Sequence, residues 1–258
     1  MNSLKAVDTH CHLESDEFRI DLPEVIDRAS ALGVSMISSG INPVDWPKCL
    51  RISGQYPNVY AAVGLDPAMY SDQQAALRCI REASSRIVAV GEIGLDHYLV
   101  REHTMRLQQE ETFRAMIHIA SELRLPIQVH SRSAGRRALE VVRDCEATRV
   151  QMHAFDGKAS LARDASRDLG YYFSIPTSVV RSPQKRKLVT AVDYEHLLVE
   201  TDSPVLGADR TMRNEPSNVC LVIGEIAGIL RREKDEVRTT ILENTRRLYP
   251  TIGTKQQS

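Results

Sequence analysis

The sequence predicts an α/β protein folded as a (β/α)8 TIM barrel, and three observations support this fold class. Eight short apolar runs of strand type recur at fairly even intervals, and longer segments with helical periodicity lie between them. Strands that alternate with helices form a parallel sheet, and eight strands close it into a barrel. The chain of 258 residues also suits one barrel of about 250 residues. A doubly wound open sheet is the alternative, although no Gly-x-Gly-x-x-Gly follows the first strand.

The eight expected strands are short runs rich in apolar side chains. Such runs are typical of strands that are buried on both faces, as in a barrel covered by helices. In chain order they are residues 4–9 (LKAVDT), 34–39 (VSMISS), 58–64 (NVYAAVG), 87–92 (IVAVGE), 126–130 (PIQVH), 148–153 (TRVQMH), 171–175 (YYFSI) and 196–201 (HLLVET).

Three of the intervening segments carry clear helix signals. Residues 23–33 begin with Pro23, which a first helical turn tolerates, and end at Gly33, a common helix stop. Residues 107–125 place apolar side chains three and four residues apart, as one face of a helix requires. Residues 215–232 supply a last long helix.

The composition favours a single globular domain over residues 1–258. Hydrophobic residues make up 42% and charged residues 26%, and no repeat or linker rich in Pro, Gly or Ser divides the chain. Five scattered cysteines without a Cys-x-x-Cys pair indicate reduced thiols. No signal-type stretch and no long apolar window is present, so we expect a cytoplasmic protein without a membrane span. A net charge of −1 argues against a duplex-coating basic field, so an acidic partner must be held locally.

Residue types that bind metal ions follow five of the expected strands. Two histidines come one residue apart in "AVDTHCHLES", and side chains two apart in a strand point to the same side. The carboxyl ends of barrel strands form the active-site face, and closure brings the eighth strand beside the first. Six candidate ligands therefore converge on one mouth: His10 and His12 after the first strand, Glu92 after the fourth, His130 after the fifth, His153 after the sixth and Asp202 after the eighth.

Six ligands exceed what one tetrahedral ion needs and suit two neighbouring divalent cations, with Glu92 placed to bridge them. The expected cofactor is therefore two metal ions per chain, of zinc, magnesium, manganese or nickel. Singly, each residue has a structural explanation, such as a satisfied polar group at a strand end or a turn-capping aspartate. His118 within a helical pattern and His196 at a strand start are interpreted as structural.

Six stretches of the chain resemble, in order, the signatures of the TatD family of metal-dependent nucleases in the amidohydrolase superfamily. They are DTHCHL (8–13), GEIGLD (91–96), PIQVHSR (126–132), MHAFDG (152–157), ETDSP (200–204) and RNEPSNV (213–219). The resemblance spans nearly the whole chain and implies a (β/α)8 barrel that hydrolyses DNA or RNA phosphodiesters, often as a 3′ exonuclease. It also implies two metal sites: His10, His12, Glu92 and Asp202 for one ion, and Glu92, His130 and His153 for the other.

The chain departs from the family pattern after the third expected strand. Relatives usually have Gly-x-His-Pro there, whereas this chain has Asp66 in place of the histidine. A carboxylate near the substrate would repel a phosphodiester unless a metal ion or an arginine neutralised it. His97 and Ala154 also replace an expected aromatic residue and a cysteine, but neither is a predicted ligand.

Asp202 has a second expected role at the mouth, and two further residues, Glu200 and Arg132, have roles there as well. Asp202 would both hold the first metal and accept the proton of the attacking water, which makes it the predicted catalytic residue. Glu200, two residues earlier on the same face, would orient a ligand, or else form a structural salt bridge inside the barrel. Arg132 follows His130 by two residues, and its guanidinium suits bidentate phosphate contact, so it is the predicted substrate-binding residue.

Basic residues also cluster after the seventh and eighth expected strands. The loop "RSPQKRK" (181–187) carries four cations and no acid, and Arg210 and Arg213 follow the eighth strand. These residues either touch nucleic acid or form a solvated face. Because only 5% of the residues are aromatic, extensive base stacking is not expected, and a single-stranded DNA or RNA end is the expected substrate. No obligate protein partner is predicted.

Two other function classes were weighed against a 3′–5′ exonuclease. The first keeps the metals but cuts an ester or amide, as a D-aminoacyl-tRNA deacylase does, and Asp66 is the feature that supports it. The second is a barrel that serves only as a binding scaffold. The complete ligand set argues against the scaffold, because buried carboxylates and histidines without a cation cost stability.

Overall fold

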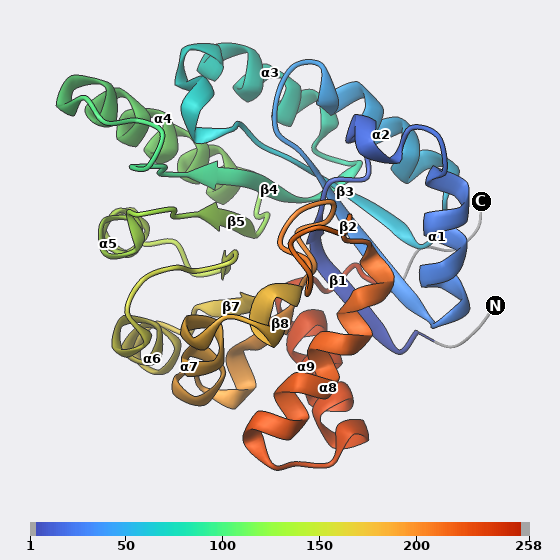
Figure 1. Ribbon diagram of the computed structural model, residues 1–258. Coiled ribbons are helices and arrows are strands. Elements are labelled where there is room, and N and C mark those ends of the chain that lie inside the picture. Colours follow the sequence, from blue (N-terminus) through green and yellow to red (C-terminus); the bar gives the residue numbers. More distant parts are fainter. Residues whose placement is uncertain (1–3, 254–258) are drawn as a thin grey trace.

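The computed structural model describes residues 4–253, which form a parallel eight-stranded barrel surrounded by helices (Figure 1). The strand order follows the chain order from β1 to β8, and each strand pairs in parallel with the next. The predicted (β/α)8 fold is therefore confirmed. The strands are β1 (Ala6–Cys11), β2 (Val34–Gly40), β3 (Val59–Val63), β4 (Ile87–Gly94), β5 (Ile127–His130), β6 (Val150–Met152), β7 (Tyr172–Ile175) and β8 (Leu197–Val199).

The barrel closes through the residues that follow β8 and not through a long ladder between β8 and β1. The backbone N–H of Asp202 donates to the carbonyl of His10 at 2.9 Å. Beside it, the buried carboxylate of Asp8 accepts the backbone N–H of Thr201 at 2.8 Å and its hydroxyl at 2.5 Å. The eighth strand was expected to run to residue 201, but it ends at Val199, because the residues beyond it bond to β1 through side chains and single backbone contacts.

The helices lie on the outside of the strands, as the apolar pattern predicts (Figure 1). Together with short 3-10 turns they connect successive strands, and α8 and α9 follow the last one. The helices are α1 (Leu22–Ala31), α2 (Asp45–Gln55), α3 (Gln73–Ala83), α4 (His103–Glu122), α5 (Gly135–Asp144), α6 (Ala159–Asp168), α7 (Pro183–Ala191), α8 (Val219–Leu230) and α9 (Lys234–Leu248). Among residues 4–253, no helix combines the length and apolar character needed to cross a bilayer.

Two expectations about the helices were wrong. The segment 215–232 is not the last helix, since α9 follows α8. Apolar residues of α9, such as Leu242 and Leu248, pack beneath the barrel. The basic segment 181–187 is not a loop, because α7 begins inside it at Pro183. Ser182 caps that helix by accepting the backbone N–H of Lys185 at 3.3 Å, an arrangement that favours proline at the next position.

The interior of the barrel is polar in the middle and apolar at the bottom. Tyr249, just after α9, is fully buried among apolar side chains that point inward from the strands, and its hydroxyl donates to Oε1 of Gln151. Above it, the amide of Gln128 donates to the carbonyl of Thr9 at 2.7 Å. These contacts fix a polar layer directly below the carboxyl ends of the strands, where the candidate ligands lie.

Candidate metal centre

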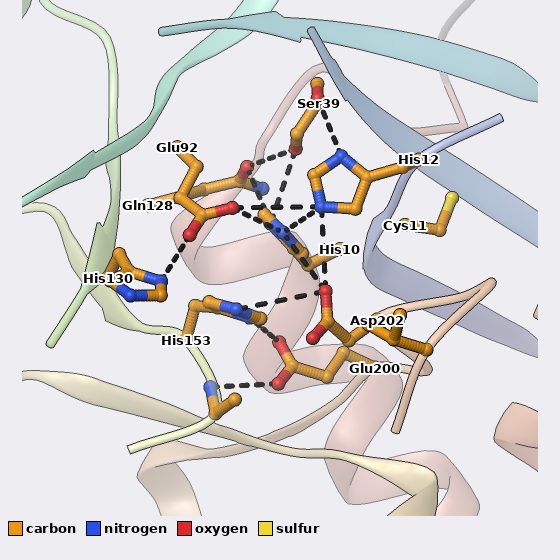
Figure 2. A network of polar contacts seen from close by, with 12 residues as sticks. His10, Cys11, His12, Ser39, Glu92, Gln128, His130, His153, Glu200 and Asp202 are labelled. Atoms are coloured by element: carbon orange, nitrogen blue, oxygen red, sulfur yellow. Dashed lines mark hydrogen bonds and ion pairs between the residues drawn. The ribbon is translucent and has the colours of Figure 1, made fainter. Parts of the chain in front are cut away.

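A β-bulge in β1 aims the first two histidines into the barrel. The register between β1 and β2 shifts by one residue between Asp8 and Cys11, so one residue of β1 is extra. A bulge of this kind redirects side chains and is frequent beside active sites. As a result His10 and His12 point to the barrel axis, with their Nε2 atoms 3.2 Å apart, while Cys11 turns away and donates its thiol to the carbonyl of Ile37 (Figure 2).

Ring nitrogens and carboxylate oxygens converge above the polar layer (Figure 2). Nε2 of His10 lies 3.3 Å from Oε2 of Glu92, and Oδ1 of Asp202 lies 3.7 Å from the same nitrogen. Asp202 Oδ1 is also 3.5 Å from Nε2 of His12 and 3.8 Å from Nε2 of His153. Two groups within residues 4–253 have three ligand atoms close enough to hold an ion: His10 with Glu92 and His153, and His10 with His12 and Asp202.

Three of these histidines are oriented through their other ring nitrogen. Nδ1 of His10 lies 3.2 Å from Oε1 of Gln128, and Nδ1 of His12 donates to the carbonyl of Ser39 at 2.9 Å. Nδ1 of His153 lies 3.0 Å from Oε2 of Glu200. Because an acceptor holds each Nδ1–H, each Nε2 keeps its lone pair for a cation.

The role expected for Glu200 matches its position, but two of the other orienting residues were not predicted. Gln128 precedes His130 by two residues on the same strand, and that spacing was a usable signal. Ser39 acts through its backbone carbonyl, which no sequence pattern reveals.

Close backbone approach places Glu92 and His130 side by side. Gly94 has φ +144°, and a Cβ there would lie 2.0 Å from the carbonyl oxygen of His130, so only glycine allows β4 and β5 to meet in this way. Nδ1 of His130 contacts Oε1 of Glu92, and its Nε2 lies 3.1 Å from Oδ2 of Asp96. Asp96, which closes the GEIGLD stretch, was not singled out from the sequence. His130 therefore contacts Glu92 among the other predicted ligands and belongs to neither three-atom group found within the described residues.

The carboxylates and imidazoles of the cluster stabilise one another's charged forms. Burial favours neutral imidazoles, but the carboxylates of Glu200 and Asp202 raise the pKa of His153 to about 8. Burial likewise opposes ionisation of Glu92, yet His130 and the other imidazoles hold its pKa well below the usual range. Burial also works against the charge of Asp202, and the histidines lower its pKa. The carboxylates are thus ionised ligands, and protons on the rings take the place a cation would occupy.

The donor set fits a divalent cation. Nitrogen and oxygen ligands lie about 2.0–2.2 Å from zinc, which places neighbouring tetrahedral ligands about 3.3–3.6 Å apart. The Nε2–Nε2 separation of His10 and His12 is 3.2 Å, and the separations from these nitrogens to Glu92 and Asp202 are 3.3–3.7 Å. These separations between ring nitrogens and carboxylate oxygens therefore match those of ligands around one divalent ion.

A cavity of about 510 Å³ opens above these ligands. Arg132 lines it, and its guanidinium carbon lies 3.9 Å from the centre of the Tyr98 ring. Asp66 is not part of the lining within the described residues. It begins a 3-10 turn and accepts the backbone N–H of Ala68 at 2.7 Å, and burial raises its pKa. The carboxylate that replaces the family histidine thus has one oxygen held by the backbone, and its charge is influenced by Glu92 and His130, although it does not line the cavity within the described residues.

A parallel eight-stranded barrel with histidines and carboxylates gathered at the carboxyl ends of its strands defines a metal-dependent hydrolase. Comparison with known proteins narrows this class. A family model described as TatD related DNase matches residues 7–250. The chain belongs to this family, and the resemblance of its motifs is thereby confirmed.

Individual relatives agree with this assignment. The chain is 33% identical to the deoxyribonuclease TATDN3 of Homo sapiens over 95% of each chain. It is 28% identical to the 3′-5′ ssDNA/RNA exonuclease TatD of Klebsiella pneumoniae, over 94% of this chain and 97% of that one. The crystal structure of YJJV, a TatD homologue of Escherichia coli, superposes with a TM-score of 0.87 at 26% identity, covering 96% of this chain and 98% of that one. The protein is thus a metal-dependent hydrolase, and a purely structural scaffold is not supported.

Proposed function

We propose that the protein is a 3′–5′ exonuclease that removes nucleotides from single-stranded DNA or RNA ends at a centre of two divalent cations. The observation that carries the proposal is the convergence of three Nε2 atoms on the carboxylates of Glu92 and Asp202. The Klebsiella pneumoniae relative is named a 3′-5′ ssDNA/RNA exonuclease, and this supports the choice of substrate.

Six residues would hold the two cations. His10, His12, Glu92 and Asp202 would bind one, and Glu92, His130 and His153 the other. When bound, such a pair lowers the pKa of a coordinated water to about 7 and stabilises charge on the phosphoryl oxygens.

Asp202 is suited to take the proton released by the attacking water. Its Oδ1 faces the three histidines, whereas Oδ2 has no hydrogen-bond partner among the described residues. One oxygen is therefore available for a ligand role and the other for proton transfer. The histidines facing Oδ1 lower the pKa of this carboxyl group, which keeps it in the basic form that a proton acceptor needs.

Arg132 would hold a phosphate at the rim of the cavity. Its guanidinium carbon lies 3.9 Å from the centre of the Tyr98 ring, and the group forms no ion pair within the described residues, so it can offer two parallel N–H donors to phosphate oxygens. Asp66 does not line this cavity within the described residues, and one of its oxygens is held by the backbone N–H of Ala68.

The proposal is tested with a single strand labelled at its 5′ end and incubated with Mg²⁺, Mn²⁺ or Zn²⁺. We expect stepwise shortening from the 3′ end with the wild type and none with Asp202→Asn, while elemental analysis finds two metal equivalents in the wild type. Aminoacyl-tRNA is assayed in parallel. Ester cleavage without oligonucleotide trimming would replace the exonuclease proposal with the deacylase alternative. Equal cleavage by the wild type and by Asp202→Asn would show that Asp202 has no part in the mechanism.

A further inference from the structure

The four cations of segment 181–187 have different environments. Arg181 donates Nε to the carbonyl of Gly207 at 3.0 Å, and Arg186 pairs with Glu225 at 2.9 Å. Lys187 is exposed. Lys185, in contrast, lies on the inner face of α7 and is 8% exposed. Most of this basic segment is thus an ordinary helix surface, and one of its lysines is buried.

Lys185 has hydrogen bonds but no counter-ion. Its Nζ donates to the carbonyls of Ala154 and Phe155 at 2.6 and 2.7 Å. Within residues 4–253 it forms no ion pair with a carboxylate. An ammonium group has three N–H donors, so one is uncommitted, and no carboxylate contacts the charge directly. Burial lowers the pKa of Lys185 to about 8, against the opposite effect of Glu200, Asp156 and Asp202.

The same side chain lines the cavity above the metal ligands. Arg132 and the carboxylate of Asp156 line it as well, so the cavity adds two cationic groups and one carboxylate to the metal ligands. A buried charge without a partner is costly, and the cost is recovered when an anion of fixed geometry arrives. A phosphodiester is the anion that this family's reaction brings.

We propose that Lys185 is a phosphate-binding residue of the catalytic cavity, whose uncommitted N–H donates to a non-bridging oxygen of the nucleotide held there. The identity of the substrate in this inference rests on the proposed function. The binding of phosphate by Lys185 is independent of that function and is measured separately.

The competing explanation is that Lys185 only ties down the segment after His153, and the chain offers a matched control for it. The side-chain amide of Gln184 donates hydrogen bonds to the carbonyls of Phe155 and Gly157 at 3.2 and 2.9 Å, so it holds the same segment without carrying a charge. Gln184→Leu removes such a tie, and Lys187→Met removes a charge from the exposed side of the same helix. Lys185→Gln keeps a donor for the carbonyls, and Lys185→Arg keeps the charge.

The metal-loaded wild type and each variant are titrated with inorganic phosphate and with a nucleoside 5′-monophosphate, by calorimetry. We expect Lys185→Gln to weaken both about ten- to hundredfold, as loss of a charge-assisted hydrogen bond does. The metal stoichiometry should stay unchanged, and Lys185→Arg should restore much of the affinity. Gln184→Leu and Lys187→Met should stay within about twofold of wild type.

Two results would overturn the inference. The first is a folded Lys185→Gln protein that binds phosphate as tightly as the wild type. The second is an equal loss of phosphate affinity in Gln184→Leu, which would assign the effect to the position of the segment and not to the charge of Lys185. If the protein trims no oligonucleotide, the exonuclease proposal fails while the phosphate titration still decides the role of Lys185.

Discussion

The carboxylate of Glu200 lies 3.0 Å from Nδ1 of His153, and its other oxygen accepts the backbone N–H of Ala154 at 2.8 Å. The hydroxyl of Ser174 donates to the first oxygen at 2.5 Å. Glu200 is fully buried and forms its ion pair with a single histidine. It therefore fixes both the ring orientation of a candidate metal ligand and the backbone that follows it.

Replacement of Glu200 by glutamine tests this orienting role. Glu200→Gln keeps the size of the side chain but removes its charge and places an amide beside the ring, so the preference of Nδ1 for its proton is lost. We expect the affinity for the metal to fall about ten- to hundredfold. A metal titration of the apoprotein measures this, with Glu243→Gln on the exposed side of α9 as the control. An unchanged affinity would make Glu200 a purely structural residue.

The backbone at Asp202 determines which substitution is informative there. Its φ is +55°, a left-handed conformation that asparagine adopts readily and alanine does not. Asp202→Asn and Asp202→Ala should both lower the rate of cleavage about 10²–10⁴-fold, as loss of a general base does. Only the alanine variant should also lose about 1 kcal/mol of unfolding free energy relative to the asparagine variant. Chemical denaturation of the two metal-free variants checks this difference, and equal stabilities would contradict it.

The sequence predicted the fold and the candidate ligands because both depend on short patterns. A barrel brings the carboxyl ends of its strands together, so His10, Glu92 and Asp202 could be placed at one mouth from the order of the strands alone. The start of α7 is also encoded, in Ser182 and Pro183, although the run of basic residues around them predicts a loop.

Other features could not be predicted because they depend on contacts between distant segments. Ser39 comes from β2, and nothing local distinguishes it from other polar residues of buried strands; Gln128 on β5 carries only its spacing from His130 as a signal. The burial of Lys185 depends on the carbonyls at 154 and 155, which belong to another βα unit. The place of Asp66 outside the cavity lining of the described residues likewise depends on the 3-10 turn that it caps and not on its residue type.

The stacking of Arg132 on Tyr98 predicts a difference between two substitutions that keep the positive charge. Arg132→Lys loses both the planar donor edge and the stacking, so we expect KM for a single strand to rise about tenfold. Tyr98→Leu keeps the arginine and loses an exposed cation–π contact worth about 0.5–1 kcal/mol, so KM should rise only about two- to fivefold. Steady-state kinetics measures both, and kcat should change little. A larger effect in kcat than in KM would place Arg132 in the chemical step.

Away from the metal centre, the carboxylate of Glu110 on α4 accepts hydrogen bonds from two arginines. Arg137 on α5 donates to both of its carboxylate oxygens, at 2.8 and 2.7 Å, and Arg114 donates to one of them at 3.0 Å. Partial burial opposes ionisation, but the arginine hydrogen bonds outweigh it and lower the pKa of Glu110. Arg137 also pairs with Glu140 at 3.0 Å, so removal of this arginine affects two carboxylates.

A lowered pKa in the folded state makes the stabilisation by this ion pair depend on pH in one direction. It is fully present above the pKa that Glu110 has in the unfolded chain, and it is lost as the pH falls through the lower pKa of the folded state. We therefore expect Arg137→Gln to reduce the unfolding free energy by about 0.5–1 kcal/mol near neutral pH, because the pair is partly exposed. The deficit should shrink as the pH is lowered past about 4.3, the ordinary glutamate value. Urea denaturation across this range measures the deficit, with Arg136→Gln on the same helix as the control for loss of one positive charge. A deficit that stays constant with pH, or that appears equally in the control, would show that packing or net charge, and not the Glu110 carboxylate, accounts for the stability.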